Sequence, residues 1–123
     1  MSQKKFDLED RLLDYAADII RMVERLPHTR TGNHIADQIL RSGTSPLPNH
    51  GEAQAAESKN DFVHKMSICL KELRETRRWL RLILRVYANK LSSETRPLLE
   101  ETEELIMIFS ASIKTARQTV VGR

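Results

Sequence analysis

The sequence has little of what disulfide-bonded, nucleotide-binding or membrane-spanning proteins need. It has one cysteine, four glycines and four prolines among 123 residues, and aromatic residues make up only 5%. Because one cysteine cannot form an internal disulfide, a disulfide framework is excluded. The glycines stand in neither a G-x-G-x-x-G nor a Walker pattern, so the usual nucleotide-binding loops are absent. No apolar run approaches the roughly 18 residues that a membrane span needs.

The first residues, MSQKKFDLED, lack the apolar segment of a signal peptide. Together with the single cysteine, this predicts a cytoplasmic protein. Little of the sequence alternates β-branched and polar residues, so strands are not expected. Hydrophobic residues make up 40% and charged residues 30%. This composition is typical of a soluble helical domain with a modest core.

The apolar periodicity predicts four helices within one domain over residues 1–123. The first covers residues 6–26, the second begins near residues 31–33, and the third covers 61–87. A turn in ANKLSSETRP precedes the fourth helix, which extends over about 92–119. The links are short, so we predict an all-α, antiparallel up-and-down four-helix bundle.

The second helix carries two conflicting signals. Pro46 and Pro48 each lack an amide donor and disfavour helical geometry in the preceding residue, which indicates a loop between two short helices. However, four polar residues recur at a spacing that places them on one helical face, which indicates a continuous helix. These residues are Arg41, Ser45, Asn49 and Glu52. On a helix, we expect them to form a buried or interfacial polar network that fixes register; from the residues alone both interpretations stay open.

The third helix has three distinct faces, whereas one core requires only one apolar stripe. The core face comprises Phe62, Met66, Cys69, Leu73, Leu80, Ile83, Leu84 and Tyr87. The second apolar face comprises Ile68, Trp79, Leu82 and Val86. The basic stripe comprises Lys71, Arg74, Arg78, Arg81 and Arg85. The second apolar face predicts an oligomer interface, because large apolar side chains outside a core usually mark a contact and tryptophan is enriched there.

The basic stripe has two possible interpretations. Residues 71–90 contain seven Lys/Arg and two Glu, whereas residues 94–104 contain five Glu and one Arg. A row of cations suits nucleic-acid phosphates, because lysine and arginine displace the counterions condensed there. Alternatively, Glu75 could pair with Arg78, and acidic residues of the fourth helix could neutralise the other cations, leaving a solvated surface.

No catalytic or metal-binding pattern is found. His28, His34, His50 and His64 include no Glu-x-x-His pair, so we expect solvated histidines and no metal. Cys69 lies on the core face, where it behaves as an apolar residue. No serine has the strand–turn–helix context of a nucleophile elbow. We therefore expect no cofactor and no enzymatic activity.

A longer pattern resembles the four-helix-bundle family labelled S23 ribosomal protein or 23S rRNA intervening-sequence protein. The matching features lie within QILRSGTSPLPNHGEAQAAESKNDFVHKMSICLKELRETRRWLRLI, and the opening DLEDRLLDYAADIIRMVERLP also looks like that family's first helix. The residues that carry the resemblance are Arg41, Ser42, Ser45, Asn49, Glu52, Ala53, Ser58, Asp61, Phe62, Lys71, Glu72, Glu75, Trp79 and Leu80. The chain departs from the family pattern at Pro46 and His50.

The resemblance implies a four-helix bundle that assembles as a ring-like homopentamer. It also extends to the accessory proteins of diversity-generating retroelements, which bind nucleic acid and a reverse transcriptase. It supplies no catalytic residues, and it favours a second helix kinked near Pro46 and Pro48 over a true loop. The resulting hypothesis is a non-enzymatic oligomer that binds RNA or DNA through the basic stripe. The alternative is a purely structural or protein-binding homo-oligomer with no nucleic-acid role. The resemblance also names a reverse transcriptase as a candidate protein partner.

Overall fold

The computed structural model describes residues 7–121 and their side chains as far as residue 118, and this part of the chain is helical without strands. Its elements are α1 (Leu8–Val23), α2 (Arg30–Thr44), α3 (Pro46–Gln54) and α4 (Lys59–Val121). α4 consists of two helices joined at Tyr87, whose φ of −122° and ψ of 27° are not helical. We call residues 59–86 the N-terminal arm and residues 88–121 the C-terminal arm.

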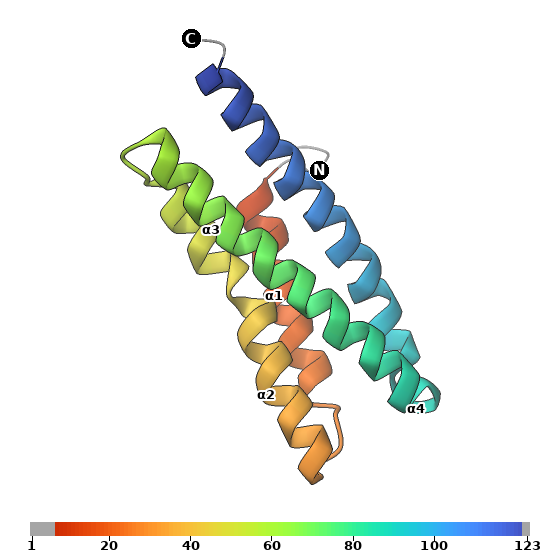
Figure 1. Cartoon of the computed structure of the whole chain (residues 1–123). Coiled ribbons are helices and arrows are strands. Elements are labelled where there is room, and N and C mark those ends of the chain that lie inside the picture. Colours follow the sequence, from red (N-terminus) through yellow and green to blue (C-terminus); the bar gives the residue numbers. More distant parts are fainter. Residues whose placement is uncertain (1–6, 122–123) are drawn as a thin grey trace.

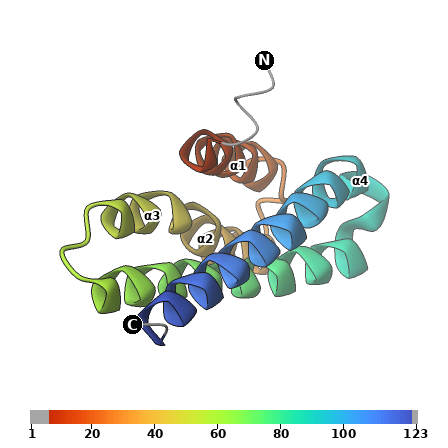
Figure 2. The ribbon, with the colours of Figure 1, turned by 90° about the horizontal axis from the view of Figure 1, so that it is seen from above.

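The helices alternate in direction along the bundle. α1 is followed by α2 and α3, which run back beside it, and the two arms of α4 then complete the bundle (Figure 1). Seen from above, the two arms fold back along each other from the reversal at Tyr87 (Figure 2). The predicted antiparallel four-helix bundle is therefore confirmed.

The second predicted helix is kinked rather than interrupted by a loop. Ser45, between α2 and α3, has helical angles (φ −60°, ψ −37°). Its amide donates to the Arg41 carbonyl and its own carbonyl accepts from the Asn49 amide, each at 3.2 Å. Pro46 and Pro48 fall in the first turn of α3, where amide groups have no partner inside their own helix. Both prolines are tolerated there for this reason.

Local hydrogen bonds fix where two helices begin. Thr29 caps α2, because its hydroxyl accepts from the Gly32 amide at 3.1 Å. α2 thus begins slightly before the expected start at residues 31–33. Ser58 caps α4 by accepting from the Asp61 amide at 3.0 Å. At the other end of the N-terminal arm, the helix resumes directly after Tyr87. The prediction of a long turn in ANKLSSETRP is therefore wrong.

The core lies between all the helices and contains most of the predicted apolar positions. The fully buried large side chains include Leu12, Ile19, Ile39, Met66, Leu73, Leu80, Ile83, Leu105 and Phe109. Two large apolar residues of α1 face solvent, Leu13 at 53% exposure and Ile20 at 42%. Tyr15 is buried in the core, where a hydrogen bond of 2.6 Å with the Thr102 hydroxyl satisfies its own hydroxyl group. Over the described residues, no helix is apolar for long enough to cross a membrane.

Candidate nucleic-acid interface

The basic stripe lies on the outer surface of the N-terminal arm. All five of its residues are exposed, whereas Leu73 and Leu80 on the opposite side of the same arm are completely buried. Core packing therefore fixes the rotation of the arm and turns the stripe outward. Arg74 to Arg85 covers about 16 Å of helix rise, enough to meet several phosphates.

The two glutamates within the N-terminal arm do not pair with the stripe. The Glu75 carboxylate accepts from Arg41 of α2 at 2.9 Å and from the Trp79 indole at 3.1 Å. Glu72 lies 3.6 Å from the same Arg41 guanidinium. The Glu75–Arg78 pair that could have neutralised part of the stripe is not among the ion pairs of the described residues.

Four of the five glutamates of the C-terminal arm are also engaged elsewhere. They reach across the bundle to α1 and its following turn, or to Arg77, which lies beside the stripe but outside it. These pairs are Arg11–Glu101 at 2.6 Å, Arg11–Glu104 at 3.1 Å, Arg25–Glu94 at 3.0 Å and Arg77–Glu103 at 3.1 Å. The hydrogen bonds that Arg11 donates to Glu101 are the main reason that the pKa of Arg11 is raised. Within the described part of the chain, none of the five stripe cations has an ion-pair partner.

The second apolar face divides into a covered part and an uncovered part. Trp79 is half-buried, and its ring meets the edge of the His34 ring at a centroid distance of 6.0 Å. Ile68 is also half-buried. Leu82 and Val86 remain 41% and 57% exposed. Trp79 thus packs within its own chain, and the unpartnered apolar surface lies toward the Tyr87 end of the arm.

Of the four residues of the predicted polar network, only Ser45 and Asn49 are joined by a hydrogen bond between their side chains within the described part of the chain. The Asn49 side-chain amide donates to the Ser45 carbonyl at 3.0 Å and lies 2.9 Å from the Ser45 hydroxyl. Arg41 instead reaches Glu75, and Glu52 pairs with Lys65 at 2.7 Å. The structure therefore joins Ser45 to Asn49, whereas Arg41 and Glu52 each tie the kinked helix to α4.

One of the four histidines differs from expectation. His28, His34 and His64 are exposed, but His50 is buried at 3% exposure, so the expectation of a solvated side chain was wrong there. His50 lies on the buried face of α3 and packs edge-to-face with Phe109, with 6.1 Å between the ring centroids. Burial lowers the pKa of His50. The described residues contain no group of three possible metal ligands.

Cys69 has the surroundings of a core residue. It is completely buried, and its thiol lies 3.6 Å from the Pro46 carbonyl oxygen. Burial raises the pKa of the thiol to about 12, so it is protonated at neutral pH. A protonated, buried thiol is a poor nucleophile.

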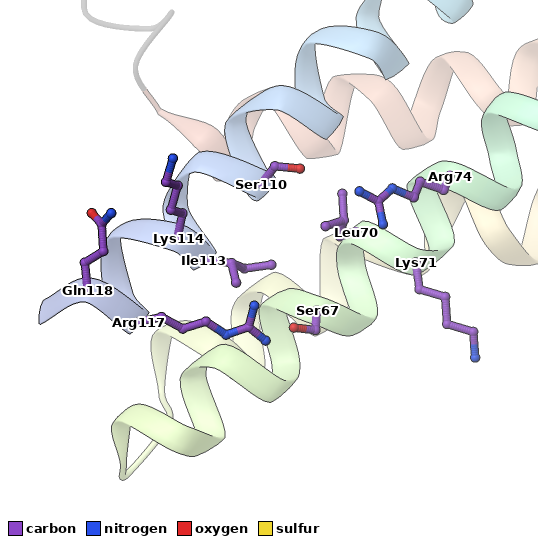
Figure 3. A pocket seen from close by; sticks show the side chains of 9 residues that line it. All are labelled: Ser67, Leu70, Lys71, Arg74, Ser110, Ile113, Lys114, Arg117 and Gln118. Carbon is purple, nitrogen blue, oxygen red and sulfur yellow. The ribbon is translucent and has the colours of Figure 1, made fainter. Parts of the chain in front are cut away.

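A groove adjoins the basic stripe between the two arms of α4. It has a volume of about 740 Å³ and shares Lys71 and Arg74 with the stripe. The remaining lining residues are Ser67, Leu70, Ser110, Ile113, Lys114, Arg117 and Gln118. Figure 3 shows the Arg117 side chain reaching from the C-terminal arm toward the N-terminal arm, while Lys71 points away from the other lining residues. Sequence reasoning missed Lys114 and Arg117; their spacing of three residues on one helix was the available signal.

The sequence model for the 23S rRNA-intervening sequence protein matches residues 4–111 of this chain. That match covers most of the chain. The chain belongs to this family. The recognised pattern from Arg41 to Leu80 falls inside the matched range.

A solved structure of this family is similar in fold. It is described as a protein of unknown function from the S23 ribosomal protein family of Bacteroides thetaiotaomicron, with 32% sequence identity and a TM-score of 0.79. The similarity covers 86% of this chain and 97% of the other. Among curated proteins, none matches this chain. Membership of the intervening-sequence family thus agrees with the helical-bundle fold but assigns no activity to this chain.

Proposed function

We propose that this intervening-sequence family protein is a non-enzymatic, oligomeric accessory protein that binds RNA or DNA phosphates through its basic stripe. The observation that carries the proposal is the charge arrangement on α4. Five cations share one exposed face, and six of the seven glutamates of α4 pair with Arg41, Arg11, Arg25 and Arg77 instead. Such a face favours a polyanion, because each phosphate contact releases counterions.

The stripe supports binding that tolerates different sequences. None of its residues is aromatic, so it offers no platform for stacking successive bases. Its arginines stand on one rigid helix and meet phosphates as point contacts along the backbone. Repetition of the stripe around an oligomer would raise the local positive potential and strengthen a contact that is weak in one subunit.

A charge-reversal experiment tests this proposal. Replacing Arg78 and Arg85 by Glu should abolish retention of RNA and DNA at moderate salt while circular dichroism and sedimentation stay unchanged. The matched control replaces Arg30 and Arg96, two exposed arginines outside the stripe, by Glu. It makes the same change in net charge and should retain binding. Equal loss in both variants would show a response to net charge alone and would overturn the assignment to the stripe.

The second candidate is a structural or protein-binding homo-oligomer without a nucleic-acid role. The observation that favours it is the apolar surface left at Leu82 and Val86. A second copy of the chain, or a protein partner such as a reverse transcriptase, would cover that surface. Wild-type protein that assembles but shows no salt-dependent binding to any nucleic acid would favour this candidate.

A further inference from the structure

The groove between the arms of α4 differs chemically from the rest of the basic stripe. Its lining combines apolar side chains, Leu70 and Ile113, with the hydroxyls of Ser67 and Ser110. Four of the nine lining residues are cations, although the Lys71 side chain points away from the groove, and none of the nine is acidic. The stripe alone offers cations on a convex helix face, whereas the groove adds a concave apolar surface beside them.

Cations approach the groove from both arms. Arg74 belongs to the stripe on the N-terminal arm, and Lys114 and Arg117 belong to the C-terminal arm. The Arg117 side chain extends across the groove in the direction of Ser67 (Figure 3). Within the described residues, neither Arg74 nor Arg117 belongs to an ion pair, so both guanidinium planes are available to a ligand. A guanidinium plane can stack on a nucleobase as well as bind a phosphate.

The size and lining of the groove suit one nucleotide. Its volume of about 740 Å³ lies in the usual range of small-ligand sites, about 300–1,000 Å³. Apolar side chains can contact the flat face of a base, hydroxyls can bond its polar edge, and the flanking cations can hold its phosphate. Because Lys71 and Arg74 belong to both surfaces, a strand that follows the stripe leads directly to the groove.

We propose that the groove receives one unstacked nucleotide of a single strand whose backbone follows the basic stripe, so that the protein prefers single-stranded nucleic acid over duplex. This inference rests on the proposed function. A base in a duplex must first be unpaired and unstacked before it can enter such a site. Phosphate contacts alone favour the opposite order, because a duplex carries the higher charge density. A single-strand preference is therefore a property that the stripe without the groove would not produce.

The test compares a short labelled RNA strand of mixed sequence with its duplex of equal length, at one fixed salt concentration. Wild-type protein should bind the single strand more tightly. Ser110→Trp fills the groove without changing charge and should weaken single-strand binding by about tenfold while leaving duplex binding unchanged. The matched control is Ala111→Trp, which adds the same side chain at an exposed neighbouring position outside the groove, and should bind as wild type.

A second pair of variants keeps the inference testable if Ser110→Trp does not fold. Arg117→Gln removes a groove cation outside the stripe and should weaken single-strand binding only. Arg81→Gln removes a stripe cation outside the groove and should weaken binding of both forms alike. The inference would be overturned if wild-type protein bound the two forms with equal affinity or bound the duplex more tightly. It would also be overturned if Arg117→Gln weakened the binding of single strand and duplex equally. Each of these results would leave the stripe proposal standing. If wild-type protein binds neither form, the proposed function fails first and the inference fails with it.

Discussion

Two pairs of hydroxyl groups in the core are hydrogen-bonded across helices. The Tyr15 hydroxyl of α1 lies 2.6 Å from Thr102 on the C-terminal arm, and Ser42 of α2 lies 2.8 Å from Thr76 on the N-terminal arm. Thr76 and Thr102 also donate to carbonyls one turn earlier in their own helices. A buried hydroxyl without a partner is costly, so these bonds restrict how the helices can be aligned.

The His50 imidazole is less well satisfied. One ring nitrogen, Nε2, lies 2.9 Å from the Gln54 side chain, but Nδ1 is buried without a partner among the described residues. Burial lowers the pKa of His50, although the carboxylates of Glu9 and Asp7 oppose that shift. The folded protein therefore takes up a proton on His50 less readily than the unfolded chain does.

This difference predicts acid-sensitive folding. Above the ordinary histidine pKa of about 6.5, His50 is neutral in both states and the folded state has its full stability. As the pH falls below that value, the unfolded chain binds the proton first and the free energy of unfolding decreases. Chemical denaturation at a series of pH values should show this decrease, and His50→Leu should remove part of it. His64→Leu, at an exposed histidine, is the control and should leave the decrease intact; a wild-type-like slope in His50→Leu would contradict this account.

At the scale of the helices, α1 and α2 pack closely against each other at Gly43. A Cβ atom at this position would lie 2.9 Å from three side-chain atoms of Ile19, which is itself completely buried. Gly43→Ala should therefore lower the free energy of unfolding by about 1–3 kcal/mol, because the core must shift to admit a methyl group. Urea denaturation of the purified variant measures the change.

Gly51 provides the matched comparison within α3. A Cβ atom there meets nothing within 4 Å, and the backbone is helical. Gly51→Ala should raise the free energy of unfolding by about 0.5–1 kcal/mol, because alanine loses less conformational entropy in a helix. Opposite signs for the two glycines are expected; destabilisation by both would mean that the kinked helix tolerates no added side chain.

Apolar periodicity was sufficient to predict the number and order of the helices, but not their exact bends. Pro46 and Pro48 indicate either a kink or a loop in the second helix. The helical angles of Ser45 show that the helical path continues from α2 into α3. The burial of His50 could have been predicted, because Ile39, Gly43, Pro46 and His50 follow the 4, 3, 4 spacing of one buried helical face. The sequence predicts the position of the reversal near Tyr87 correctly but overestimates its length. Ser, Asn and Pro in ANKLSSETRP are typical turn residues, yet here they lie in a helix.

On the scale of the whole molecule, ion pairs between helices leave the basic stripe uncompensated. The acidic first half of the C-terminal arm pairs with cations of α1, of the turn after it and of the neighbouring arm. Linear sequence could show the five cations on one face, but it could not show which glutamates would reach them. The groove was missed for a related reason: Leu70 and Ile113 are far apart in sequence and meet only through the packing of the arms.

The exposed part of the second apolar face predicts self-association. Leu82→Glu combined with Val86→Glu should give a folded monomer in sedimentation velocity, because both side chains are exposed in one chain and the change costs little folding energy. These positions are better tested than Trp79, whose half-buried ring also packs on His34.

The control for this prediction is Leu13→Glu, at an exposed leucine of α1 outside the second apolar face. It should keep the wild-type sedimentation coefficient. An unchanged oligomer in the Leu82/Val86 double variant would show that the contact between subunits lies elsewhere.

The salt dependence of single-stranded RNA binding tests the central claim most directly. If the five stripe cations each contact a phosphate, the logarithm of the association constant should fall against the logarithm of salt concentration with a slope of about −3.5 per subunit, at about −0.7 per contact. Arg78→Gln combined with Arg85→Gln should make that slope shallower by about 1.4. A slope near zero in the wild type, or the same steep slope after both arginines are removed, would contradict phosphate binding by the stripe.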